Sequence, residues 1–284
     1  MSITNFFKTN IKNYRIICFG NGVRNKSRLL KIALLQSIPE KVKCFFGLNR
    51  KIEEVIKNQW NGITVEIDGI KYALVDSESF DIVNESESFI LAWLKPKKGE
   101  VFLDVGAHIG KYTLKMAREV GDAGLVIAVE PNPDNYQMLQ KGIALNNVQN
   151  VIALNMAAWN VESMLKLFIG HLAGHHSAKI DWKLGWCEVK ARPMDNVIEE
   201  CGINKVDWIK IDVEGAEWEV LLGLEKTISK HRAKVIVELS HENVGKVKEF
   251  IKKERYGIIK ISSTFEGVIY GVPRKYAYFL LLPL

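Results

Sequence analysis

From residue 100 onwards, short apolar runs alternate with longer amphipathic stretches, and this alternation limits the possible folds more than any other feature. The apolar runs have the length of buried strands, and the stretches between them carry apolar residues at helical spacing. Such alternation predicts a mainly parallel sheet covered by helices on both faces. The predicted strands are Val101–Val105, Leu125–Val129, Val151–Leu154, Val206–Ile211 and Val235–Leu239, and the predicted helices are Lys111–Val120, Pro133–Leu145, Met194–Cys201 and Glu217–Ser229.

The remaining strand-like runs lie in the third connection and in the tail. Leu165–Ile169 and Glu188–Ala191 fall within the long third connection. The tail carries three more runs without comparable helices, so we expect antiparallel strands to finish the sheet. The predicted fold class is α/β, a Rossmann-like doubly wound sheet of seven strands. Residues 81–284 form this domain, beginning with a short helix within Asp81–Leu94.

Residues 1–80 are predicted to be a basic N-terminal extension. Residues 1–60 hold twelve Lys/Arg and three Glu, a net charge of +9, which leaves −3 for the remainder of a chain of net charge +6. Helical spacing is present in Ser27–Leu35 and Lys51–Trp60, and Asp68-Gly69 between alternating apolar residues predicts a β-hairpin over 62–75. The extension could face a polyanion or contact an anionic membrane peripherally. An ordinary solvated helical surface is the alternative.

No window approaches the ~18–20 uncharged apolar residues of a membrane span. The short apolar piece Ile16–Phe19 does not suit a signal peptide, so we expect a cytoplasmic protein. The four cysteines are scattered without a CxxC pair, and free buried thiols are expected rather than a zinc or redox motif.

Asp104 lies at the C-terminal end of the first predicted strand and begins the pattern Asp-x-Gly-x-x-x-Gly, with Gly106 and Gly110 before a helix. Ligands of doubly wound folds bind at the carboxyl ends of strands. Gly106 would let the backbone approach a ligand, and Gly110 would let the helix pack close to the strand. A nicotinamide dinucleotide is the alternative, but it needs G-x-G-x-x-G around a pyrophosphate, which Asp104 would repel. S-adenosylmethionine (SAM) carries a sulfonium, an ammonium and no phosphate, so the pattern favours SAM.

Polar residues after the second and third predicted strands are placed to contact the nucleoside part of the cofactor. Glu130 follows the second strand, where an acid can accept both ribose hydroxyls. A helix-start acid stabilised by the macrodipole is the alternative, and the spacing from the glycine loop favours the ligand. Asn155 follows the third strand and would lie beside the adenine, although a turn-forming Asn is equally adequate.

Acidic residues follow the fourth and fifth strands. Asp212 should face the same crevice as the glycine loop, where it could balance positive charge on the cofactor or deprotonate an acceptor. Glu217 suits the first turn of the next helix, and Glu214 fits either position. Glu238 is costly inside an apolar strand unless paired. Glu238 or His241 could be the general base, with a capping or surface position as the alternative for His241.

The segment Gly170–Trp182 is rich in glycine and histidine and lies near the expected cofactor mouth. Loops in such positions commonly carry specificity, so His175, His176 and Ser177 are predicted to contact the acceptor. A mobile polar loop is the alternative. The histidine spacing matches no ligand signature, and no metal is predicted.

These motifs resemble the FkbM-type family of class I SAM-dependent methyltransferases. FLDVGAHIGKYTL (Phe102–Leu114), AVEPNPDNYQMLQKGIALNN (Ala128–Asn147) and especially VDWIKIDVEGAEWEVLLG (Val206–Gly223) carry the resemblance, which covers roughly residues 85–284. The resemblance implies that Glu87 matches a glutamate common in the family. The residues predicted to bind the cofactor are Glu87, Asp104, Val105, Gly106, Ala107, Gly110, Glu130, Pro131, Asn132, Asn155, Ala157 and Asp212, and the catalytic candidates are Asp212, Glu214, Glu238 and His241.

The resemblance implies O-methylation of a sugar, a glycan or another small molecule. An RNA or protein methyltransferase that uses the basic extension to hold its substrate is the alternative. Asp-Val-Glu-Gly replaces the Asn/Asp-Pro-Pro-Tyr/Phe motif of enzymes that methylate amino groups of nucleic acids, which counts against N-methylation of bases. A non-catalytic protein that keeps the fold is disfavoured by the intact Asp104, Glu130 and Asp212.

Overall fold

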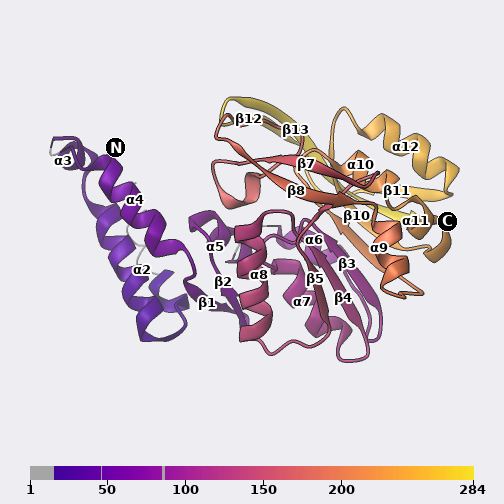
Figure 1. Cartoon of the computed structure of the whole chain (residues 1–284), viewed down its shortest axis with the longest axis horizontal. Helices are drawn as coiled ribbons and strands as arrows, with labels where there is room; N and C mark the ends of the chain where they lie inside the picture. The colour runs from indigo at the N-terminus through magenta and orange to yellow at the C-terminus, as the bar shows by residue number, and fades with distance from the viewer. Residues whose placement is uncertain (1–15, 46, 85–86) are drawn as a thin grey trace.

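An eight-stranded sheet forms the centre of the computed structural model, which describes residues 16–45, 47–84 and 87–284 (Figure 1). Its order is β11-β13-β10-β9-β3-β4-β5, and β12 pairs with β13 as an eighth strand. Strands β10, β9, β3, β4 and β5 are parallel, and β13 is antiparallel to both of its neighbours. The bounds are β3 Val101–Val105, β4 Leu125–Val129, β5 Val151–Leu154, β9 Trp208–Ile211, β10 Lys234–Ser240, β11 Tyr256–Lys260, β12 Phe265–Ile269 and β13 Val272–Pro283.

Helices cover both faces of this sheet, because successive strand residues point to opposite sides. One face packs against α6 (Ser88–Trp93), α7 (Lys111–Val120) and α8 (Pro133–Leu145). The other face packs against α9 (Met194–Glu200), α10 (Glu217–Leu222), α11 (Glu225–His231) and α12 (Val244–Lys253), which Figure 1 shows together on one side. The predicted Rossmann-like α/β fold is confirmed.

The N-terminal part combines a helical arm with a hairpin. The arm comprises η1 (Ile16–Phe19), α2 (Gly22–Ser37), α3 (Glu40–Phe45) and α4 (Asn49–Trp60), and the hairpin joins β1 (Thr64–Ile67) to β2 (Ile70–Ala73) around Asp68-Gly69. Figure 1 shows the arm extending away from the body beyond the hairpin. Buried residues of the hairpin share one apolar core with α2 on one side and with α7 and α8 on the other. The hairpin therefore joins the arm to the body.

The third connection forms a separate three-stranded sheet. Strands β6 (Ala157–Ala158) and β7 (Ser163–Phe168) flank β8 (Trp186–Arg192), in the order β6-β8-β7. A loop with the short helix η2 (Ala173–His175) joins β7 to β8. Helix α5 (Ser77–Asn84) approaches this loop, since Asp76 and Glu78 accept hydrogen bonds from the backbone N–H groups of Ala173 and Gly174 at 2.8 Å.

Three expectations need correction. The predicted helix Glu217–Ser229 is two helices broken at Gly223, where a Cβ would lie 2.0 Å from the carbonyl oxygen of Trp159. Within the expected short helix Asp81–Leu94, residues 81–84 belong to α5 and residues 88–93 belong to α6. The free cysteines are not buried, since Cys18, Cys44 and Cys201 are exposed and Cys187 is half-buried. The expected antiparallel finish of the sheet is confirmed, since β13 pairs antiparallel with β10, β11 and β12.

Candidate active site

Polar side chains replace apolar ones near the carboxyl ends of the central strands, on the face toward α7. Asp104 of β3 lies beside Lys210 of β9 in register, and Glu238 of β10 lies opposite Tyr278 of β13. All four are buried. Residues further back on this face, such as Phe102, pack in the apolar core. The pleat therefore aligns four polar residues from four adjacent strands.

A cavity of about 240 Å³ opens at these strand ends. Its walls contain carboxylates, small apolar residues and the ends of several loops. Of the predicted site residues, those that line it are Glu87, Val105, Gly106, Ala107, Glu130, Pro131, Ala157, His175, His176, Asp212, Glu214 and Glu238. Among the residues that the structure describes, the predicted ones outside its walls are Asp104, Gly110, Asn132, Asn155, Ser177 and His241.

Asp104 lies beneath the cavity. Its Oδ2 accepts a hydrogen bond from Thr113 Oγ1 of α7 at 2.6 Å, and the side chain is fully buried. Burial raises the pKa of Asp104, and the nearby Lys210 ammonium opposes that rise. Asp104 Oδ1 has no hydrogen-bond partner within the described part of the chain. Asp104 thus lies between Thr113 of α7 and Lys210 of β9 and does not line the cavity.

The two glycines of the loop are required by protein contacts. Gly106 has φ +82°, and a Cβ there would lie 1.8 Å from the carbonyl oxygen of Asp212. Gly110 has φ +93°, and its Cβ would lie 2.7 Å from Leu139 Cδ1 of α8. Gly106 lets the loops after β3 and β9 touch, and Gly110 lets α7 pack close to α8.

Glu130 holds the turn between β4 and α8 and reaches the cavity. Its Oε2 accepts from the backbone N–H of His108 at 2.8 Å, and its Oε1 accepts from the N–H of Asn132 at 2.9 Å. Burial raises the pKa of Glu130 to about 7, although these hydrogen bonds oppose the rise. The carboxylate is therefore fixed in orientation against the glycine loop.

Asn132 and Asn155 stabilise the same turn. Asn132 caps α8 by accepting from the N–H groups of Asp134 and Asn135 at 2.9 and 3.1 Å. The Asn155 amide donates to the carbonyl oxygens of Glu130 and Pro131 at 2.9 and 3.1 Å. These hydrogen bonds match the turn-forming role of Asn155, which was expected as the alternative to a place beside the adenine.

A hydrogen-bond network connects α6, α7, β9 and β13 around Glu87. The hydroxyls of Tyr112 and Tyr278 donate to Glu87 at 2.9 and 2.7 Å, and Tyr278 also lies 2.9 Å from Asp212 Oδ2. Lys210 Nζ donates to the same Asp212 oxygen at 3.2 Å. Burial opposes the charge of Lys210, but Asp212 and Asp104 raise its pKa above the ordinary value. Glu87 and Asp212 thereby share one polar wall.

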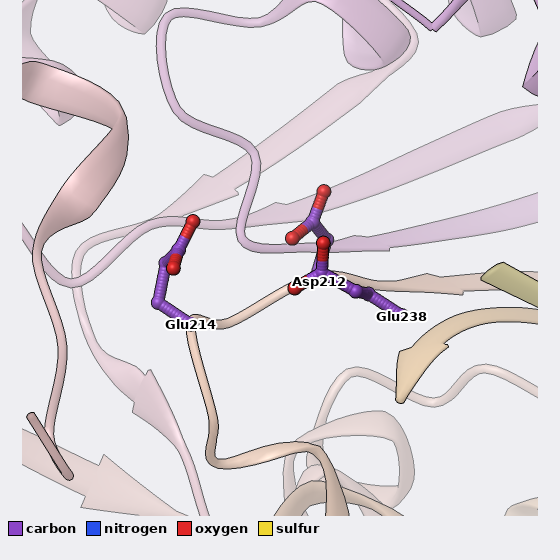
Figure 2. Close-up of side chains that lie close together, drawn as sticks. All are labelled: Asp212, Glu214 and Glu238. Carbon is purple, nitrogen blue, oxygen red and sulfur yellow. The ribbon is translucent and has the colours of Figure 1, made fainter. Parts of the chain in front are cut away.

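Asp212, Glu214 and Glu238 form a cluster of carboxylates that extend to the same side of the strand ends (Figure 2). One oxygen from each lies within 4.8 Å of the others, a spacing that could hold a cation. Arg274 of β13 already places a guanidinium there, 2.8 Å from Glu214 and 3.9 Å from Glu238. Burial raises the pKa of Glu214 to about 7, Arg274 opposes the rise, and Asp212 adds to it. Burial and the neighbouring carboxylates likewise raise the pKa of Glu238.

The loop between β7 and β8 covers part of the cavity. His175 and His176 line it, whereas the buried Ser177 hydroxyl donates to the backbone oxygen of Glu214 at 2.7 Å. An aromatic cluster ties this loop to the tip of the β12–β13 hairpin. Tyr270 stacks on His171 with ring centroids 4.0 Å apart and meets Trp182 edge-on at 6.5 Å. Loop and hairpin thus contact each other beside the cavity.

His241 stands apart from this site. It follows β10, is exposed, and lines a different hollow on the surface together with Lys248 and Lys260. Because Glu238 and His241 are three residues apart around the end of a strand, they do not share one face.

Several cavity residues were not identified from the sequence. His108, with φ +53°, has ring nitrogens that lack hydrogen-bond partners among the described residues, and burial lowers its pKa to about 4. Lys210 carried a detectable signal, since it is a charged residue inside an apolar strand. The period-two spacing along β13 also placed three polar residues on one face. The cavity residues missed include His108, Lys111, Tyr112, Lys210, Tyr276 and Tyr278, and Arg274, which pairs with Glu214, was missed as well.

Glu217, a buried glutamate near the cavity, should make the stability of the protein depend on pH. Its Oε1 accepts from the N–H of Gly215 at 2.8 Å, and burial raises its pKa to about 7 from 4.5. A raised carboxyl pKa means that the folded state binds the proton more tightly, so this contribution is lost as pH rises from about 4.5 to about 7. We expect Glu217→Gln to flatten the decline in Tm between about pH 4.5 and about pH 7, by the equivalent of roughly 1–3 kcal/mol.

Thermal unfolding monitored by circular dichroism measures this slope. Glu249→Gln changes an exposed glutamate of α12 and should leave the slope as in wild type. Equal slopes for Glu217→Gln and wild type would show that Glu217 does not gain a proton on folding.

A cavity at the carboxyl ends of a parallel sheet, with a glycine loop after the first strand and an acid after the second, defines the chain as a Rossmann-like ligand-binding protein. The family model of the methyltransferase FkbM domain matches residues 104–258. The chain belongs to the FkbM methyltransferase family, which confirms the predicted membership.

Curated relatives are distant and match only part of their length. Methyltransferase 1 of Beauveria bassiana is 27% identical over 48% of this chain and 63% of its own length. Hexuronic acid methyltransferase AglP of Haloferax volcanii is 26% identical over 56% of this chain and 64% of its own. The chain thus spans less than two thirds of either relative. A crystal structure of Methyltransferase FkbM from Methylobacillus flagellatus has a TM-score of 0.48 at 16% identity, over 95% of this chain and 58% of that one.

Proposed function

We propose that this chain is a SAM-dependent methyltransferase that methylates a hydroxyl group of a sugar, glycan or other small molecule. The observation that carries the proposal is Glu130, which lies in the cavity wall beside the glycine loop and is oriented by two backbone N–H groups. A carboxylate in this position suits the two ribose hydroxyls of a nucleoside.

The character of the cavity fits SAM. Carboxylates of Glu87, Asp212, Glu214 and Glu238 outnumber the cations Lys111 and Lys210 in its walls, which favours a ligand with a sulfonium and an ammonium. Small apolar residues such as Ala157 and Pro131 leave space for a flat base. Phosphate would meet carboxylates on most sides, so a dinucleotide fits less well.

The residues of this chain have separable tasks in the proposed reaction. SAM, when bound, supplies an activated methyl group. Glu130 would hold the ribose, while Asp212 and Glu87, fixed by Tyr278, would face the positively charged part. Orientation of two reactants can contribute up to roughly 7–11 kcal/mol. Glu214 would take the proton of the acceptor hydroxyl, because it lines the cavity and has a pKa near neutrality.

A hydroxyl acceptor is favoured by the need for this base. A hydroxyl must lose a proton as it attacks carbon, and the acid cluster offers a carboxylate to receive it. The name of the Haloferax relative, a hexuronic acid methyltransferase, is consistent with a sugar. The acceptor test is a screen of sugars, glycans, phenols, peptides and RNA with labelled SAM, in which transfer to RNA or peptide alone would overturn the proposed acceptor class.

Calorimetry tests the cofactor. We expect wild type to bind SAM and its demethylated product S-adenosylhomocysteine, but not NAD. Glu130→Gln should weaken SAM binding about 10–100-fold, because it replaces a charged acceptor of two hydroxyls by a neutral amide. Glu188→Gln, at an exposed glutamate of β8, is the matched control and should bind as wild type. Binding of NAD, or equal SAM affinity in both variants, would contradict the assignment.

A further inference from the structure

Exposed apolar side chains are concentrated on the N-terminal arm, residues 22–60. This arm carries seven of the eighteen large apolar side chains that are exposed in the part of the chain that the structure describes. Scattered single apolar residues are ordinary on a surface, whereas a group of them marks a contact site. The seven are Val23, Leu30, Leu34, Val42, Phe45, Leu48 and Val55, with exposed fractions from 36 to 86%.

The exposed residues of α2 form a stripe on its outer face. Val23, Leu30 and Leu34 follow the spacing i, i+7, i+11, which places them on one side of a helix. Leu29 and Ile32 occupy the opposite side and are buried against the hairpin core. Helix α2 therefore has two apolar faces. One is buried against the hairpin, and the other is exposed to solvent.

Positive charge surrounds the outer stripe. Residues 22–60 hold nine Lys/Arg and three Glu, a net charge of +6. At 100° per residue, Lys26 lies on one side of the stripe and Lys31 on the other, and both are exposed. Long cationic side chains that flank an apolar stripe can reach lipid headgroups while the stripe enters the acyl boundary.

We propose that the arm docks on an anionic membrane surface, with the outer stripe of α2 and Phe45 at the end of α3 inserted and the flanking cations on lipid headgroups. Nucleic acid would satisfy the cations but leave the apolar stripe in water. A second copy of the arm would cover the stripe but bring +6 against +6. Anionic lipid complements both features at once. Figure 1 shows the arm extending from the body, where it can meet a flat surface. Within the described residues no helix is long and apolar enough to cross a membrane.

Vesicle co-sedimentation of the full chain tests this proposal. Wild type should bind vesicles of phosphatidylcholine with about 30% phosphatidylserine at least about tenfold more tightly than phosphatidylcholine alone. The double variants Leu30→Ser/Leu34→Ser and Lys26→Glu/Lys31→Glu should each weaken binding to the anionic vesicles about tenfold or more. The matched controls are Met164→Ser/Val268→Ser, exposed by 60 and 66%, and Lys246→Glu/Lys248→Glu on α12, and both should bind as wild type.

The alternatives give different results. Absence of vesicle binding, equal binding to both lipids, or arm variants that bind as wild type would each overturn the proposal. A loss of affinity for a labelled RNA without a loss for vesicles would assign the arm to nucleic acid. Conversion of a dimer to a monomer by Leu30→Ser/Leu34→Ser, measured by light scattering, would assign it to self-association. The arm variants should bind SAM with wild-type affinity. A loss of membrane binding would then be independent of the proposed methyltransferase function.

Discussion

Gly106→Ala is expected to destabilise the protein by about 3 kcal/mol or more and to abolish cofactor binding. The added Cβ would lie 1.8 Å from a backbone oxygen, that of Asp212, and the residue would also keep a φ of +82°. Relief requires the loop after β3 or the loop after β9 to move, and both line the cavity. A single methyl group should therefore damage stability and site together.

Gly99→Ala is a matched control for this substitution. Gly99 has φ +83°, and none of the described residues comes within 4 Å of the position that a Cβ would occupy there. Alanine at this position therefore introduces the backbone strain alone. We expect a cost of about 1 kcal/mol for Gly99→Ala. Thermal and urea unfolding give both values, and calorimetry with SAM reports the site. Equal destabilisation by Gly106→Ala and Gly99→Ala would contradict this prediction, because it would mean that the loops after β3 and β9 move apart without a cost in stability.

Glu214→Gln should lower kcat about 10²–10⁴-fold while leaving SAM affinity close to wild type. Glutamine preserves the shape of the side chain and can still accept the hydrogen bond that Arg274 donates to Glu214 at 2.8 Å. It cannot take a proton from the acceptor. The loss should therefore appear in the chemical step, measured in single-turnover experiments with an acceptor found in the screen.

The pH dependence distinguishes a base from a structural residue. A base acts when deprotonated, so the wild-type rate should rise with pH through about 7, and this rise should be absent from Glu214→Gln. The control is Glu219→Gln, which removes only the ion pair with Lys179 at 2.6 Å. A full rate in Glu214→Gln together with a large loss in Glu238→Gln would transfer the role to Glu238.

The fold was largely predictable because its signals are local. Strands Val101–Val105, Leu125–Val129 and Val151–Leu154 have the predicted bounds, since each is an apolar run bounded by turn residues. The break at Gly223 was not predictable in this way, because the glycine is needed by a contact with Trp159. That contact joins segments far apart in the chain, and no local pattern reports it.

The candidate site was predictable mainly from residues that follow the ends of the parallel strands. Glu130 and Asp212 reach the cavity because the end of each parallel strand lies on the same edge of the sheet. Asp104 contributes nothing to the cavity walls, since its carboxylate accepts a hydrogen bond from Thr113 of α7, a contact that no local pattern indicates. Arg274 and Tyr278 enter the site through the antiparallel pairing of β13 with β10, a register that depends on the whole fold.

Strand β13 also couples the folding of the central sheet to the assembly of the candidate active site. Its residues Leu280 and Leu281 are buried in two different cores of the sheet, while Arg274 supplies the guanidinium between Glu214 and Glu238. During synthesis, β3, β4, β9 and β10 precede it, so a nascent chain holds Glu214 and Glu238 before the Arg274 guanidinium that pairs with them. Because burial of these carboxylates without a cation is costly, the pairing of β13 would complete the hydrophobic core and supply this cation in the same step.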